Sequence, residues 1–143
     1  MSPILETVSE FATEPPVVAM AGFIPAMAAY AGMPAAGFAP AQATEGEPIF
    51  ATKCALCHGD TLQGGDHGPA LKGTGFWTVW QGQPARKLYS RIISTMPYND
   101  PGTLTESETL AVTALIARSN GAAEGPSHTA ASELDAIALA PAP

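Results

Sequence analysis

The sequence predicts an all-α protein built as a single domain. Three segments, residues 47–58, 84–95 and 106–119, carry apolar side chains at helical spacing. No apolar run of the kind that forms a buried parallel strand occurs elsewhere, and the connecting segments are rich in glycine and proline. A chain of 143 residues is long enough for one modest hydrophobic core.

Each predicted helix has an apolar face, and the third also has clear ends. Thr105 and Glu108 form a capping box at its start, and Asn120-Gly121 is a typical stop. The inward-facing residues of the three helices are expected to be, in order, Ile49, Phe50 and Cys54; Leu88, Tyr89 and Ile92; and Leu110, Val112, Leu115 and Ile116.

The composition excludes some classes of function. The formal net charge is -7, from six Lys plus Arg and thirteen Asp plus Glu, which argues against binding to nucleic acid. Two cysteines are too few for a scaffold stapled by disulfides. We find no internal repeat at the periods of solenoids or propellers.

Residues 1–43 differ in composition from the rest and have three interpretations. They could be a secretory leader cleaved after Ala41-Gln42-Ala43, so that the mature chain begins at Thr44, although a basic start is missing. They could be a membrane anchor, although prolines interrupt the apolar run. They could also be a retained arm that lies on a partner. The chain is therefore divided into residues 1–43 (leader, anchor or arm), a domain at 44–121 and an Ala/Pro-rich tail at 122–143.

Both cysteines stand in "CALCH", at Cys54 and Cys57, directly before His58. This spacing suits a disulfide, a metal site, a thiol redox couple or a covalently bound haem. A structural zinc site needs a second ligand pair, and neither a second CxxC nor an HxxxH pair is present. A thioredoxin-like couple follows a strand, whereas the residues before Cys54 predict a helix.

The haem interpretation accounts for more of the sequence. In CxxCH the thiols of Cys54 and Cys57 add to the two vinyl groups of haem, and the imidazole of His58 ligates the iron. From Thr44 onward the only methionine is Met96, whose soft, neutral thioether suits the sixth position. The alternative for Met96 is an ordinary core methionine.

Other residues are expected to complete such a site. The carbonyl of Pro69 is a candidate acceptor for the second ring N–H of His58. The indole N–H of Trp80 is a candidate donor to a haem propionate. The alternatives to Trp80 are Trp77, Arg86 and Arg91, and His67 and His128 are expected to be surface histidines.

With these residues assembled, residues 44–121 resemble a class I c-type cytochrome. The resemblance depends on "CALCH", the Gly68-Pro69-Ala70-Leu71 loop and Met96-Pro97, and it covers about half of the chain. More narrowly, "CALCHGDTLQGGDHGPALKGTGFWTVWQG" and "LYSRIISTMPYNDPGTLTESE" are similar to the monohaem cytochromes that serve PQQ-dependent alcohol and sugar dehydrogenases.

The resemblance implies a small cytochrome c fold of three to five helices around one covalent haem c, with His58 and Met96 as axial ligands. It implies an electron carrier rather than an enzyme, located in the periplasm after export by a signal peptide. Its partners would be a periplasmic dehydrogenase as donor and an oxidase or another cytochrome as acceptor, with membrane anchoring through residues 1–43 as an option. The candidates for steering the partner are Lys53, Lys72, Arg86 and Lys87.

Two other functions stay open. The chain could be a cytochrome subunit permanently bound in a larger redox complex, or a haem sensor with a labile sixth ligand. The tail at 122–143 is expected either to be loosely ordered or to wrap the domain, tethered by Leu134, Ile137 and Leu139.

Overall fold

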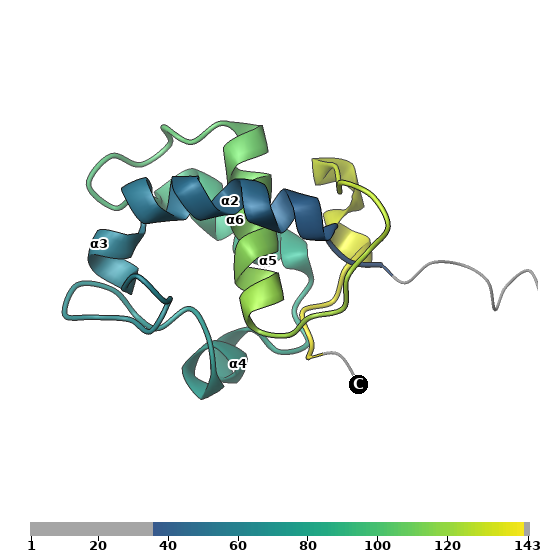
Figure 1. Cartoon of the computed structure of the whole chain (residues 1–143), viewed down its shortest axis with the longest axis horizontal. Coiled ribbons are helices and arrows are strands. Elements are labelled where there is room, and N and C mark those ends of the chain that lie inside the picture. Colours follow the sequence, from purple (N-terminus) through teal and green to yellow (C-terminus); the bar gives the residue numbers. More distant parts are fainter. Residues whose placement is uncertain (1–35, 142–143) are drawn as a thin grey trace, which may run out of the picture. The chain divides into compact units, whose positions relative to one another are not determined.

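A computed structural model of the chain describes residues 36–141. This part is helical, with isolated β-bridges in place of strands, which confirms the predicted all-α fold (Figure 1). None of its helices is both long and apolar enough to cross a membrane. The helices are α2 (Pro40–Lys53), α3 (Ala55–His58), α4 (Thr74–Trp80), α5 (Ala85–Thr95), α6 (Glu106–Ser119) and the 3-10 helix η2 (Ala131–Ala136).

The crossing of α2 over α6 forms the centre of the fold (Figure 1). A Cβ atom at Gly46 of α2 would lie 2.3 Å from the carbonyl oxygen of Ala111 in α6. The two helices approach this closely because Gly46 has no side chain. Every residue of α6 from Thr109 to Ala117 is buried, and the hydroxyl of Thr113 donates to the carbonyl of Thr109 at 2.7 Å. Helix α6 is therefore the core of the domain rather than an amphipathic surface helix.

Two of the three predicted helices have the expected bounds. Helix α5 begins after Pro84, and α6 spans the predicted residues, with Asn120 as its C-terminal cap. The first predicted helix, residues 47–58, differs from the structure in two ways. Helix α2 begins earlier, at Pro40, and the helix is interrupted at Cys54, so that α3 is a separate element. Helix α4 was not predicted, although its Phe76 is a fully buried core residue.

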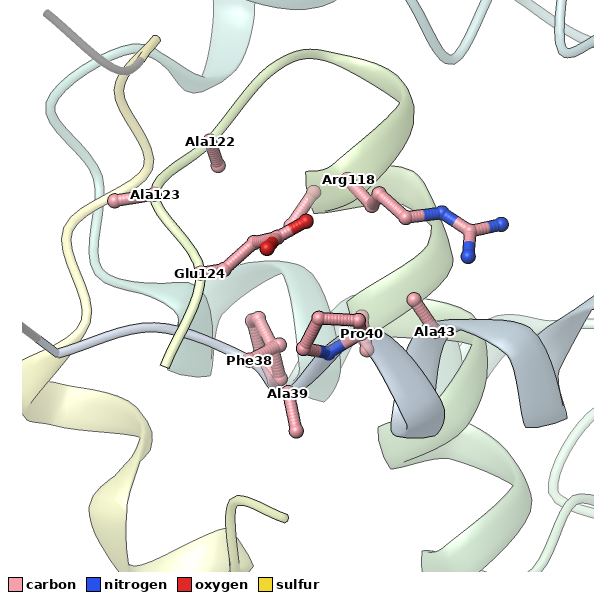
Figure 2. Close-up of a pocket in the computed structure, with 10 residues that line it drawn as sticks. Phe38, Ala39, Pro40, Ala43, Arg118, Ala122, Ala123 and Glu124 are labelled. Carbon is pink, nitrogen blue, oxygen red and sulfur yellow. The ribbon is translucent and has the colours of Figure 1, made fainter. Parts of the chain in front are cut away.

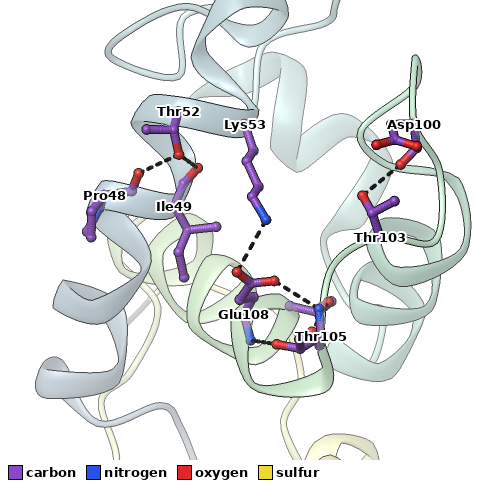
Figure 3. Close-up of polar contacts among 9 residues, drawn as sticks. Pro48, Ile49, Thr52, Lys53, Asp100, Thr103, Thr105 and Glu108 are labelled. Carbon is purple, nitrogen blue, oxygen red and sulfur yellow. Dashed lines mark hydrogen bonds and ion pairs between the residues drawn. The ribbon is translucent and has the colours of Figure 1, made fainter.

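The predicted capping box at the start of α6 is present (Figure 3). The backbone N–H of Glu108 donates to Thr105 Oγ1 at 3.1 Å, and the carboxylate of Glu108 accepts from the backbone N–H of Thr105 at 2.9 Å. The same carboxylate lies 3.2 Å from Lys53 Nζ. The cap therefore also ties α6 to the last residue of α2, next to Cys54.

Residues 37–43 pack with the folded core, so the boundary predicted at Ala43 falls within helix α2. Phe38, Gln42 and Ala43 are buried. The amide of Gln42 donates to the Thr129 carbonyl and accepts from the Thr129 N–H, both at 3.0 Å. Cleavage before Thr44 would remove this buried bond pair and the first turn of α2. The rest of the predicted leader, anchor or arm, residues 1–35, lies outside the described residues.

A small pocket lies where residues 38–43 meet residues 122–124 and the end of α6 (Figure 2). Its lining is mostly apolar, with Arg118 and Glu124 at its edge. Its lining includes none of the residues of the CxxCH motif.

The C-terminal segment packs along the helices in an extended path that we call the strap, residues 122–141. Leu134, Ile137 and Leu139 are buried, as expected for a tail that wraps the domain. The backbone N–H of Ala85 donates to the Ile137 carbonyl at 2.8 Å, and that of Leu139 donates to the Gln83 carbonyl at 2.8 Å. The strap is thereby attached to the start of α5.

Candidate functional site

The two cysteines lie at the break between α2 and α3. Cys54 is the C-terminal cap of α2, Cys57 lies in α3, and both are half-buried thiols that are not joined in a disulfide. Burial raises the pKa of the Cys54 thiol to about 11, with the adjacent Lys53 opposing the rise and Cys57 adding to it. A thiol redox couple needs a lowered thiol pKa, so this environment disfavours that alternative.

His58 ends α3, and its ring is held from one side. Its Nδ1 lies 2.8 Å from the carbonyl oxygen of Pro69, which is the partner that the sequence predicts. Since a carbonyl only accepts, Nδ1 is the donor of this hydrogen bond, and in the neutral imidazole Nε2 then keeps its lone pair. A metal-bound histidine has this arrangement, in which the second ring nitrogen donates to a carbonyl.

The loop of residues 59–73 places Pro69 against His58 by close backbone approach. A Cβ atom at Gly68 would lie 2.8 Å from the Cys57 carbonyl oxygen and 3.0 Å from His58 Nδ1. At Gly64, where φ is 88°, a Cβ atom would lie 2.7 Å from the backbone nitrogen of Ala70. Gly64 and Gly68 therefore lack a side chain for a packing reason, because the backbone comes close to other atoms of the loop and of His58 at these positions.

Met96, the predicted second ligand, is the C-terminal cap of α5. Its backbone N–H donates to the Ile92 carbonyl at 3.0 Å, and its side chain is half-buried against the core. Three exposed residues, Tyr98, Asn99 and Asp100, follow after Pro97. A methionine at a helix end next to an exposed turn does not fill the centre of the core.

Trp80 ends α4 and is half-buried. Its ring is stacked on that of Phe76 with 6.3 Å between centroids, and Trp77 meets Phe76 edge-on at 5.1 Å. The buried Phe76 therefore fixes both indoles. The role of Trp80 at a propionate stays a prediction.

The donor set fits a haem better than a bare metal ion. Within residues 36–141, no three His, Cys, Asp or Glu residues come together to hold an ion. The described residues offer two thiols, one imidazole, one thioether and several half-buried apolar side chains, the kinds of group that a flat apolar porphyrin needs. These side chains, packed against the core without being enclosed by it, include Cys54, Leu71, Trp77, Trp80, Ile93 and Met96.

The charged candidates for partner steering fall into two groups. Lys53 pairs with Glu108, and Arg86 pairs with Asp135 at 2.7 Å, so both have structural partners. Lys72 and Lys87 are exposed. His67 and His128 are exposed as predicted, and His128 lies 2.9 Å from the carboxylate of Glu45.

Sequence reasoning missed one buried polar residue beside the site. Asn120, read only as a helix stop, bonds to the loop that carries Pro69. An asparagine before a glycine usually signals a turn, so its second role had no separate sequence signal.

Comparison with known proteins identifies the family of this chain. The family model of cytochrome c oxidase, cbb3-type, subunit III matches residues 41–116, which is more than half of the chain. No curated protein matches the sequence. Among solved structures, the chain is similar to one in the crystal structure of the sulfane dehydrogenase SoxCD from Paracoccus pantotrophus, with 29% identity and a TM-score of 0.57.

That similarity covers 75% of this chain and 55% of the SoxCD chain, so our chain spans just over half of that protein's length. The matched family segment includes the CxxCH motif, the Pro69 loop and Met96. The chain therefore belongs to the cbb3-type cytochrome c oxidase subunit III family of class I c-type cytochromes, and is an electron-transfer protein that binds haem c covalently.

Proposed function

We propose that this cytochrome carries one electron at a time through a single haem, with Cys54 and Cys57 as thioether anchors and His58 and Met96 as axial ligands. The observation that carries the proposal is the 2.8 Å contact between His58 Nδ1 and the Pro69 carbonyl. The haem supplies a ferrous/ferric couple, and the protein supplies its attachment, its ligands and its apolar surroundings.

Each residue has a separate task in this proposal. The Pro69 carbonyl accepts a hydrogen bond from His58 Nδ1–H, which fixes the tautomer of His58 and would leave Nε2 to hold the iron. Met96 provides a neutral thioether, which raises the reduction potential relative to a second imidazole. If His58 and Met96 both hold the iron, no position on it would be open to a substrate, which favours electron transfer over catalysis.

The donor that we propose is a periplasmic dehydrogenase, and the acceptor is a terminal oxidase or another cytochrome. The resemblance of residues 54–121 to the partners of PQQ-dependent dehydrogenases favours a quinone-dependent donor. The similarity to a chain of the sulfane dehydrogenase SoxCD supports a dehydrogenase as donor in general. The exposed Lys72 and Lys87 would guide short encounters.

A second candidate is a cytochrome subunit held permanently in a redox complex. It is favoured by the SoxCD chain, which is longer than this one and carries a similar domain. Size-exclusion chromatography of a native extract, followed by haem absorbance, separates the two candidates. Elution of the haem at the size of a monomer supports the free carrier, and co-elution with dehydrogenase activity at higher mass supports the bound subunit.

Export to the periplasm and processing are also part of the proposal. If a leader is removed, we expect cleavage before Gly37, because residues 37–43 belong to the core. Intact mass spectrometry of the native protein gives both the number of covalent haems and the first residue. A mature chain beginning at Thr44 would contradict this placement.

The ligand assignment is tested by replacing Met96 with alanine. We expect the haem to stay attached, the near-infrared Fe–S(Met) band to disappear and the reduction potential to fall. Tyr98→Ala, which truncates an exposed side chain in the turn after Met96, is the control and should leave the band unchanged. If the band survives in Met96→Ala, Met96 is not the ligand.

A further inference from the structure

Asn120 is a buried amide at the C-terminal end of α6, 9% exposed. It makes three hydrogen bonds, each within 3 Å. Its Nδ2 donates to the carbonyls of Leu71 and Ile116, both at 2.8 Å. Its Oδ1 accepts from the backbone N–H of Gly73 at 2.9 Å. One side chain thus uses most of its hydrogen-bonding capacity on backbone groups.

Two of these partners belong to the loop that carries Pro69. Among the described residues, the other hydrogen bonds of residues 60–72 all go to residues between His58 and Leu71. Asn120 is therefore the group that attaches this loop to a helix outside it. Helix α6 is buried along most of its length, so the attachment point is rigid.

We propose that Asn120 is a positioning residue for the axial histidine. It holds the backbone at Leu71 and Gly73, and thereby keeps the Pro69 carbonyl two residues earlier within hydrogen-bond distance of His58 Nδ1. This inference rests on the proposed function, in which His58 ligates the iron.

The effect on the cofactor has a definite sign. A histidine whose Nδ1–H donates to a carbonyl is a more basic ligand, and a more basic ligand favours ferric iron. Loss of the Asn120 bonds lets the loop move and weakens the contact between His58 and Pro69. The reduction potential should therefore rise, although Asn120 itself lies behind the loop.

The experiment compares Asn120→Ala and Asn120→Asp with Ser119→Ala and Ser119→Asp. Ser119 is the exposed neighbour at the same helix end, so it controls for truncation and for added charge. Asn120→Asp keeps the acceptor for Gly73 and the side-chain volume, and it carries the test if the alanine variant does not fold. We measure the potential by spectroelectrochemistry and the His58 ring by NMR of the ferric protein.

We expect each Asn120 variant to have a higher potential than its Ser119 control, with shifted His58 ring resonances. Exchange of the His58 Nδ1 proton should become about tenfold faster, as expected for the loss of about one hydrogen bond. The inference is overturned if the Asn120 variants lose only stability, with potential, resonances and exchange equal to the controls.

The wild-type spectrum separates this outcome from failure of the proposed function. If the wild-type protein shows no His58 ring resonances shifted by the iron, the ligand assignment is wrong and the inference falls with it. If those resonances are present and do not respond to Asn120, only the inference about Asn120 is wrong.

Discussion

The two sides of the proposed haem site are held in different ways. On the His58 side, a short sequence supplies the anchors and the ligand, and the loop at residues 59–73 is fixed by backbone contacts and by Asn120. On the Met96 side, the ligand is the end of α5, and the turn that follows is bonded mainly within itself, as in the 2.9 Å bond from Thr103 Oγ1 to the Asp100 carbonyl (Figure 3).

This difference shows that the two ligand side chains are positioned in different ways. His58 is positioned by contacts close to it in sequence, and Met96 by the packing of the helix that it ends. His58 is buried and its orientation depends on contacts within about fifteen residues of chain, apart from the Asn120 link. Met96 is placed wherever α5 ends, so its position depends on what α5 packs against. One such partner is the strap, which bonds to Ala85 at the first turn of α5.

The largest effect is expected from removing an anchor of the strap. Leu134 of η2 is fully buried, and Leu134→Ala should lower the free energy of unfolding by roughly 2–5 kcal/mol. The substitution leaves a cavity beside α5, so the Met96 side should loosen first. Denaturant titration followed by far-UV circular dichroism gives the stability, and the Fe–S(Met) band reports Met96.

The control makes the same substitution on the other side of the site. Leu56, between the two cysteines, is 92% exposed, so Leu56→Ala should change the stability by less than about 0.5 kcal/mol. Two results would contradict the idea that the strap supports the Met96 side. One is an equal loss of unfolding free energy in the two variants. The other is an Fe–S(Met) band that resists denaturant as well in Leu134→Ala as in the wild type.

A smaller but more local effect is expected from Gly68→Ala on the His58 side. The added methyl group would overlap the Cys57 carbonyl and crowd His58 Nδ1, which should cost about 1–3 kcal/mol and disturb the ring resonances of His58. Gly75→Ala is the matched control, because a Cβ atom there meets only Ala70 at 3.9 Å, an ordinary contact. If both alanine variants behave alike, the close packing around His58 is not a constraint.

The His58 side was also the part of the molecule that could be predicted. The spacing of Cys54, Cys57 and His58 and the Pro69 carbonyl are local features, and a single short stretch of sequence contains them. The capping box and the bounds of α6 are local in the same sense. Such features are readable because the interacting groups lie a few residues apart.

The missed features depend on pairs distant in sequence. Gln42 pairs with Thr129 across 87 positions, and Asn120 bonds to Leu71 across 49. Residues 40–46 have few large apolar side chains, so they do not signal a buried helix, and only the close approach of Gly46 to Ala111 explains why small residues are needed there. Contacts of this kind leave no periodic pattern in a single sequence.

The smallest effect concerns pH at the contact between α2 and α6. The pKa of Glu108 is lowered, first by the hydrogen bond from the Thr105 backbone and then by Lys53. A carboxyl group whose pKa is lower in the folded state stabilises the protein above its unfolded-state pKa, and this contribution is lost as the pH falls through the folded-state value. The wild type should therefore lose some stability, relative to Glu108→Gln, as the pH is lowered from about 5 to about 3.

Denaturant titrations across this range check the expectation, with Glu106→Gln as the control. Glu106 lies in the same first turn of α6 but outside the capping box, so its variant should follow the wild-type pH profile. A Glu108→Gln profile parallel to that of the wild type would show that the cap contributes no pH dependence. Because Lys53 directly precedes Cys54, a positive result would place this pH-sensitive contact at the end of α2, next to the first covalent anchor of the His58 side.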